Sequence, residues 1–248
     1  PIGSRGLGDV YKRQTNDSKN YLIITENTCF YAESGGQVGD RGMIISQNTE
    51  FKVLDTKKTQ QGIFIHFGEL ISGSLTVGDE IELNINMSLR NSIKKNHSAT
   101  HLLHAALRNQ LGNHVAQRGS LVNEEKLRFD FSHNKQISKE QITEIQGEVN
   151  TIIANSIETD ISIKSQEDAI QQGAMALFGE KYGDEVRVVT LGSKDNKPYS
   201  IELCGGTHVD NVQDINKFQI TSEESVSSGV RRIEAVSYTH LRAHETLL

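Results

Sequence analysis

The feature that most constrains the fold of this chain is a pair of histidines, His97 and His101, inside its longest helical pattern. Apolar and histidine side chains recur at steps of three and four through residues 89–111, which predicts a helix with Ser88 as N-cap and Gly112 as its end. Residues four apart project from one face of a helix, one turn above the other. The two imidazoles could therefore share one metal ion, or they could be core or surface histidines with ordinary hydrogen bonds.

A second pair with chelating spacing lies far downstream, where Cys204 and His208 enclose two glycines and a threonine. Zinc prefers four nitrogen and sulfur ligands in tetrahedral sites. Together with His97 and His101, this pair predicts one zinc site. A zinc protease would place glutamate directly after the first histidine. Ser98 occupies that position here, so the protease interpretation fails.

Composition narrows the class of protein further. The chain has 248 residues and a net charge of -6, which argues against a nonspecific polyanion binder with a broad basic surface. Its two cysteines, Cys29 and Cys204, are too few for a disulfide framework and fit a cytoplasmic setting. No segment approaches the roughly 18 consecutive apolar residues of a membrane span. We therefore expect a cytoplasmic protein with no membrane partner.

The order of the patterns predicts an α+β fold in two parts. Residues 15–86 contain short, β-branched runs that predict a small β-barrel subdomain, with a glycine-rich loop at residues 29–40. This loop could approach a ligand closely or simply form a hairpin. Residues 87–236 mix strands and helices without strict alternation, which predicts an α+β core with a largely antiparallel sheet and the long histidine helix. Ser138 and Gln141 form a capping-box pattern for a second helix.

The two ends of the chain look foreign to this pattern. Residues 1–14 and 237–248 show neither clear strand nor core-helix periodicity, and both are similar to translated sequencing-adapter read-through. The alternative is a pair of ordinary disordered tails. We therefore exclude both ends from the fold, including His240 and His244. On this interpretation the native protein continues beyond residues 15–236.

Further motifs lie along the chain at residues 30–40, 97–104, 117–120, 128–132, 173–182, 204–209 and 231–235. In this order they resemble the editing domain of alanyl-tRNA synthetase. The similarity covers about residues 21–236. Free-standing alanyl-tRNA editing proteins resemble the chain in fold, and the second domain of threonyl-tRNA synthetase resembles it in the histidine pair and the Cys-x-x-x-His.

The resemblance implies zinc-dependent hydrolysis of mischarged Ser-tRNA(Ala) and Gly-tRNA(Ala), with the acceptor end of the tRNA as partner. It also implies that Thr100 and Gln117 belong to the editing pocket, with the Thr100 hydroxyl near the side chain of the mischarged serine. From the sequence alone, Thr100 could equally bond back to its own helix. Gln117 could equally be a polar residue on an exposed strand face. The family's metal ligands correspond to His97, His101, Cys204 and His208.

No ATP-binding or aminoacylating motif is found in the chain, so we expect ATP to act only through the aminoacylation domain of a parent enzyme. One alternative is a free-standing alanyl-tRNA editing hydrolase. Another is a non-catalytic, zinc-stabilised RNA-binding module, because four protein ligands make a closed tetrahedral site.

Overall fold

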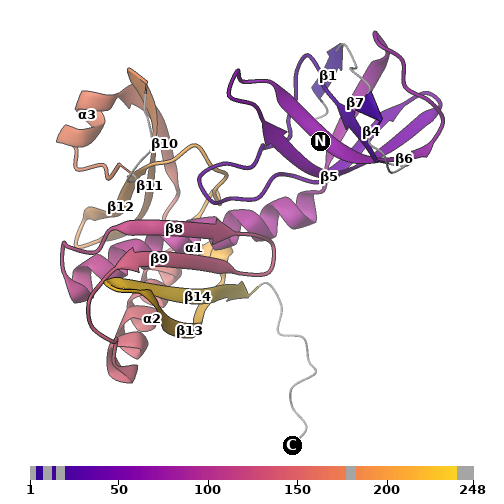
Figure 1. The fold of residues 1–248 in the computed structure, drawn as a ribbon. Helices are drawn as coiled ribbons and strands as arrows, with labels where there is room; N and C mark the ends of the chain where they lie inside the picture. The colour runs from indigo at the N-terminus through magenta and orange to yellow at the C-terminus, as the bar shows by residue number, and fades with distance from the viewer. Residues whose placement is uncertain (1–3, 8–12, 15–19, 177–182, 239–248) are drawn as a thin grey trace, which may run out of the picture. The chain divides into compact units, whose positions relative to one another are not determined.

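The computed structural model describes residues 4–7, 13–14, 20–176 and 183–238. The chain divides into two compact units, residues 1–90 and 91–248. Antiparallel sheets and a few helices make up both units (Figure 1), which confirms the predicted α+β class. The division lies four residues after the predicted boundary at residue 86, inside helix α1 (Met87–Leu111). No helix among the described residues is long and apolar enough to cross a membrane.

The first unit is built on one seven-stranded antiparallel sheet. In the central strand, β5 (Thr49–Lys58), every second side chain near the start is buried, including Phe51 and Val53. This alternation is expected for a sheet with one face packed on a core. In spatial order the strands are β1 (Ser4–Leu7), β7 (Glu80–Ile85), β4 (Gly42–Ser46), β5, β6 (Phe64–Ser72), β3 (Asn20–Ile23) and β2 (Arg13–Gln14).

The strand order of this sheet has two edges among the described residues, and the small β-barrel subdomain predicted from the sequence stays a prediction. β1 and β2 lie at opposite edges of the strand order, and no described pairing joins them. Run lengths in a sequence predict strands, but closure depends on tilt and stagger, which the runs do not encode. The core of the unit consists of Ile23, Phe30, Ile44, Phe51, Val53, Ile81 and Leu83.

The glycine-rich loop forms a tight hairpin, which was one of the two alternatives. Ser34 and Gln37 exchange backbone hydrogen bonds of 3.2 and 2.9 Å around Gly35 and Gly36. Both glycines have positive φ, +58° and +87°, a combination that glycine adopts without a Cβ penalty. The hairpin carries the chain toward Asp40, where the loop is anchored.

Asp40 anchors the loop to the start of α1. Its carboxylate accepts hydrogen bonds from Arg90 Nε at 2.8 Å and from the backbone N–H of Tyr31 at 2.6 Å. Arg90 Nη2 also contacts this carboxylate and donates to the carbonyl of Cys29 at 3.2 Å. A buried ion pair with its remaining donors and acceptors satisfied fixes geometry. Both ends of the loop are thus attached to one arginine.

The second unit contains α1 at its centre. The helix is capped by Asn86, whose Oδ1 accepts from the N–H of Leu89 at 3.2 Å, and not by Ser88 as predicted. Both residue types cap helices well, so sequence preference alone could not decide between them. Every residue from Asn96 to Leu107 is buried, so this part of α1 is enclosed on all sides rather than along one stripe.

Two antiparallel sheets and two further α-helices complete the described part of this unit. The capping box of α2 (Lys139–Ala154) is confirmed, because Ser138 and Gln141 bond to each other's backbone N–H groups. The other helical elements are α3 (Gln166–Gln171) and the 3-10 helix η1 (Val212–Ile215). The four-stranded sheet has the order β13 (Lys217–Ser227), β14 (Val230–Tyr238), β9 (Leu127–Ser132) and β8 (Gln117–Val122). The three-stranded sheet has the order β10 (Asp160–Ser165), β11 (Glu185–Lys194) and β12 (Lys197–Leu203).

The ends differ in part from the expectation that residues 1–14 and 237–248 stand outside the fold. The backbone of β1 pairs with β7, and that of β2 pairs with β3. At the other end β14 continues past residue 236, and Ser237 donates from N and Oγ to Asn96 Oδ1 at 3.1 and 2.7 Å. Asn96 is buried and needs these donors. Residues 1–3, 8–12 and 239–248 lie outside the described residues.

The anchor of the glycine-rich loop generates the first prediction. Asp40→Asn leaves Arg90 without its counter-charge, and we expect the free energy of unfolding to fall by about 3 kcal/mol, the lower end of the range for buried pairs. Arg90 keeps 14% of its side-chain surface in solvent, which moderates the loss. Urea denaturation of the 248-residue chain measures it. The control, Lys52→Ala, breaks an exposed pair with Glu69 and should cost less than about 1 kcal/mol. Equal losses of unfolding free energy in Asp40→Asn and Lys52→Ala would contradict the role of Asp40 as an anchor of the loop.

Candidate metal centre

Helix α1 and the loop after β12 bring four metal-binding side chains together. His97 and His101 come from α1, and Cys204 and His208 come from the loop. One ligand atom of each lies within 4.8 Å of those of the other three. Cys204 Sγ is 3.5 Å from His97 Nε2 and 3.3 Å from His208 Nε2. The convergence predicted from the sequence is confirmed.

The arrangement fits a tetrahedral zinc ion. Zinc bonds of about 2.0–2.3 Å place neighbouring ligand atoms roughly 3.3–3.8 Å apart, the range of the two sulfur–nitrogen distances. The three imidazoles are at most 5% exposed. Buried polar rings without partners are costly, and a shared ion would satisfy all of them together. Three nitrogens and one thiolate are also a donor set that zinc prefers.

Two neighbouring side chains engage the far nitrogens of these rings. Ser98 Oγ lies 3.1 Å from His208 Nδ1 and accepts from the N–H of Val209 at 3.1 Å. Glu202 Oε2 lies 2.9 Å from His101 Nδ1 as an ion-pair contact. Contacts at Nδ1 leave Nε2 free to bind a metal. Sequence reasoning missed both roles, although Glu202 stands only two residues before Cys204, near the end of β12.

The electrostatics of the cluster favour the metal-binding forms of Cys204 and His208, whereas His101 keeps a proton. Burial raises the pKa of the Cys204 thiol, but His97 and His101 outweigh burial and hold that pKa well below its ordinary value. Burial, reinforced by His97, lowers the pKa of His208 to about 3, so this ring is neutral near pH 7. Burial lowers the pKa of His101, but the Glu202 carboxylate and Cys204 together outweigh burial and raise that pKa to about 10. A binding metal would displace the proton of His101.

The loop that carries Cys204 is held by an arginine on the adjacent strand. Arg187 Nη1 donates to the carbonyls of Cys204 and Gly206 at 2.7 and 2.8 Å. The backbone N–H of Cys204 donates to the carbonyl of Arg187 at 3.0 Å. The N–H of Gly206 lies 3.4 Å from Cys204 Sγ, where it would stabilise a thiolate. These bonds hold the Cys204 loop against β11.

The two expected pocket residues lie on elements of the same unit. Thr100 is buried on α1, and its hydroxyl donates to the carbonyl of Asn96 at 2.8 Å, so the back-bonding alternative is present. Gln117 is half-buried at the start of β8 and lies opposite Phe131 of β9. Residues directly opposite in a sheet share a face. Since Phe131 is fully buried, Gln117 is on the core-facing side and not on an exposed face.

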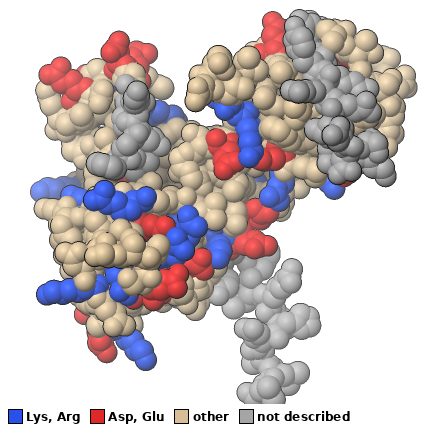
Figure 2. All heavy atoms as spheres, viewed as in Figure 1, with Lys and Arg blue, Asp and Glu red and all other residues tan. Residues whose placement is uncertain are grey.

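The other matching motifs have structural roles where they are described. In β9, Asp130 accepts two hydrogen bonds from Arg232 of β14, at 2.7 and 2.8 Å. Figure 2 shows Lys and Arg interspersed with Asp and Glu over β9 and β14, so these strands present mixed charge rather than a purely basic patch. In the stretch at residues 173–182, residues 177–182 lie outside the described part of the chain.

The two free cysteines provide a direct test of the metal site. Cys204→Ala removes the thiolate, one of four ligands in a site of about 10–16 kcal/mol, so we expect the zinc Kd to rise by roughly 100-fold. Cys29→Ala is the matched control, because Cys29 contacts the carbonyl of Leu83 in the first unit, and its Kd should stay within about threefold. Chelator competition measures both. Similar Kd values for the two variants would remove Cys204 from the ligand set.

Comparison with known families covers both units of the chain. The family model described as tRNA synthetases class II (A) matches residues 8–89. The model described as threonyl and alanyl tRNA synthetase second additional domain matches residues 186–234. The second match includes β11, β12 and the loop that carries Cys204 and His208.

Curated relatives agree with these matches. The alanine--tRNA ligase of Parvibaculum lavamentivorans is 52% identical over 226 residues, which is 90% of this chain and 25% of that protein. The alanine--tRNA ligase of Mesorhizobium japonicum is 48% identical over 248 residues, which is 98% of this chain and 27% of that protein. The chain therefore spans about a quarter of the length of these relatives. It belongs to the alanyl-tRNA synthetase family.

Proposed function

We propose that this chain is the editing part of an alanine--tRNA ligase, and that it hydrolyses mischarged Ser-tRNA(Ala) and Gly-tRNA(Ala) with the help of zinc. The observation that carries the proposal is the convergence of His97, His101, Cys204 and His208 in one buried cluster. The match of residues 186–234 to a domain family of threonyl and alanyl synthetases supports it. A cytoplasmic location is part of this proposal.

The physical need for such a site follows from the size of alanine. A pocket that accepts alanine cannot exclude the smaller glycine, and one missing methyl group is worth only about 1–3 kcal/mol. A hydrophobic pocket also rejects an added hydroxyl incompletely, so serine enters as well. A second, hydrolytic site then corrects both errors on the finished aminoacyl-tRNA.

The proposed reaction is ester hydrolysis. A water adds to the ester carbonyl, the bond from that carbon to the ribose oxygen breaks, and the ribose oxygen takes a proton. The products are a free amino acid and a tRNA with its terminal hydroxyl restored. Zinc held by the four donors would supply Lewis-acid polarisation to the reacting end. The buried ring nitrogens and the ordered Cys204 loop preorganise the site before substrate arrives.

Two residues are proposed to recognise the substrate. The Thr100 hydroxyl donates its only proton to Asn96, but a hydroxyl keeps lone pairs that can accept from the serine hydroxyl. Gln117 offers both a donor and an acceptor on the core-facing side of β8. Neither residue belongs to the donor cluster, so recognition and metal binding can be separated by mutation.

A non-catalytic RNA-binding module is the competing proposal, favoured by the presence of four protein donors, which can close a tetrahedral site. A free-standing editing hydrolase would have the same site and chemistry. It differs only in whether the gene also encodes an aminoacylation domain, which would supply the use of ATP. Sequencing the gene on both sides of residues 15–236 decides between the two hydrolases.

Deacylation of purified Ser-tRNA(Ala) and Ala-tRNA(Ala) tests the function. We expect the 248-residue chain to release serine faster than alanine, and a zinc chelator to abolish the release. Release of radiolabelled amino acid from the tRNA measures both rates. Equal rates on the two substrates would reject editing. Tight tRNA binding without hydrolysis would favour the RNA-binding module.

Thr100→Val tests recognition, because valine keeps the shape and removes only the hydroxyl. If Thr100 accepts from the serine hydroxyl, the preference for Ser-tRNA over Ala-tRNA should fall by about 1 kcal/mol, or roughly fivefold. Zinc content should not change. Thr143→Val is the control, since Thr143 bonds back to Lys139 in the same way on an exposed part of α2. An unchanged preference in Thr100→Val would leave the hydroxyl with only its helical role.

A further inference from the structure

A buried carboxylate outside the donor cluster contacts two histidines at once. Glu202 is 2% exposed at the end of β12. Its Oε2 lies 2.9 Å from Nδ1 of His101, and its Oε1 lies 2.9 Å from Nδ1 of His104. A carboxylate removed from water needs partners of this kind. One of the two histidines belongs to the donor cluster, and the other does not.

We propose that Glu202 is a positioning residue that fixes the His101 ring with Nδ1 on the carboxylate and Nε2 toward the other donors. His104 is the second support, because it holds the other carboxylate oxygen in place. The inference rests on the metal site of the proposed function. It assigns a role to two residues that bind neither metal nor substrate.

The chemistry of the carboxylate sets the tautomers of both rings. An ionised carboxylate only accepts hydrogen bonds, so His104 Nδ1, which is hydrogen-bonded to Oε1, carries the proton. His101 Nδ1 lies 2.9 Å from Oε2 as an ion-pair contact whose geometry falls short of a hydrogen bond, and a proton on this nitrogen is the form that the carboxylate favours. With a proton on Nδ1 facing Glu202, Nε2 is the His101 nitrogen that binds a metal, and the metal displaces the proton it carries. His104 Nε2 is buried and has no hydrogen-bond partner among the described residues, and its ring lies 5.1 Å from that of Phe129. A bare nitrogen on the far side of His104 agrees with a proton on Nδ1, bound to Glu202 Oε1 at 2.9 Å.

Glu202→Gln tests whether the protonation of the two rings depends on the carboxylate, because it keeps the shape of the side chain. The amide has one acceptor oxygen, and its nitrogen is a donor that opposes the second Nδ1–H. One of the two rings must turn or change its tautomer. Since contacts of this kind are worth about 10–100-fold in metal affinity, we expect the zinc Kd to rise by that factor.

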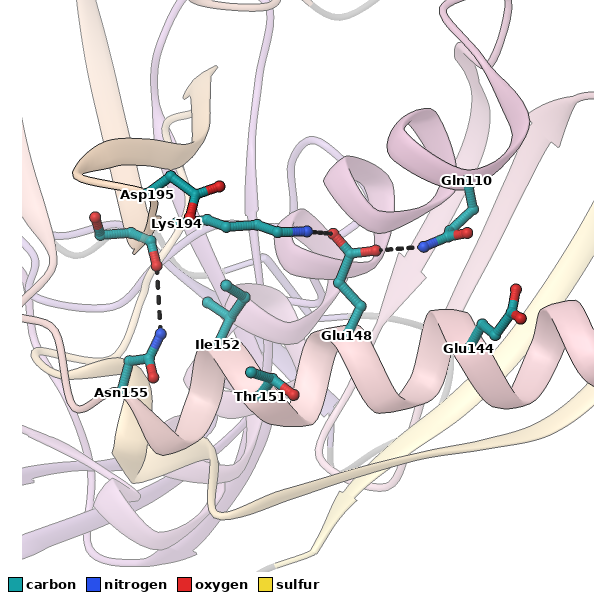
Figure 3. A pocket seen from close by; sticks show the side chains of 9 residues that line it. Gln110, Glu144, Glu148, Thr151, Ile152, Asn155, Lys194 and Asp195 are labelled. Carbon is teal, nitrogen blue, oxygen red and sulfur yellow. Dashed lines mark hydrogen bonds and ion pairs between the residues drawn. The ribbon is translucent and has the colours of Figure 1, made fainter.

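Glu148 of α2 provides a matched control. Its side chain is 8% exposed. It accepts from four side chains, namely Asn109, Gln110, Lys194 and Tyr199. It lines a separate pocket, to which none of the four metal donors contributes (Figure 3). Glu148→Gln therefore disturbs a buried, multiply bonded carboxylate without touching His101.

The experiment compares the 248-residue chain with Glu202→Gln, Glu148→Gln, His104→Phe and the double variant Glu202→Gln/His104→Phe. Chelator competition gives the zinc Kd, and the visible spectrum of the cobalt-loaded protein reports the geometry of the site. We expect a 10–100-fold higher Kd and a changed cobalt spectrum for Glu202→Gln, with both readouts unchanged for Glu148→Gln. The zinc Kd of the double variant should not exceed that of Glu202→Gln, because His104 acts only by holding the Glu202 carboxylate in place.

Tight zinc binding by the unmutated chain, combined with an unchanged Kd and spectrum in Glu202→Gln, would overturn this inference and leave the proposed function intact. Failure of the unmutated chain to bind zinc would overturn the inference together with the metal requirement. If Glu202→Gln does not fold, His104→Phe decides. A raised Kd there supports the positioning role, and an unchanged Kd overturns it.

Discussion

The second unit depends on one crossing, where the enclosed part of α1 meets the loop that follows β12. Most of the buried polar groups at this crossing come from distant parts of the chain, such as His101 and Glu202. Each needs a partner, because an unpaired polar group in a core costs several times what a surface contact contributes. The loop cannot shift without breaking the Arg187 bonds, and the helix cannot shift without breaking those of Asn96. The geometry of the donor cluster follows from these constraints.

Local signals predicted a large part of this arrangement. The spacing of His97 and His101 and of Cys204 and His208 required no knowledge of the fold, because each pair has the spacing of chelating ligands within one short segment. The capping box at Ser138 was likewise readable, since its bonds span three residues. Strand runs gave the number and class of most elements, and the mixed α+β order followed from them.

The misses share a physical cause, which is dependence on distant partners. The role of Glu202 requires knowing that it meets His104, 98 residues earlier in the chain. The burial of α1 on all sides depends on the positions of β9 and β12 beside it. The spacing of apolar residues within the helix does not encode those positions. Asn86, rather than Ser88, is the N-cap because β7 ends at Ile85 and the helix begins directly after Asn86.

The central claim is that four side chains from two distant segments bind one zinc ion. X-ray absorption at the zinc edge of the zinc-loaded chain tests it most directly, because the first coordination shell resolves sulfur from nitrogen. The account predicts one sulfur at about 2.3 Å and three nitrogens at about 2.0–2.1 Å, with the sulfur lost in Cys204→Ala. A shell of oxygen and nitrogen alone, or a spectrum unchanged by Cys204→Ala, would contradict it.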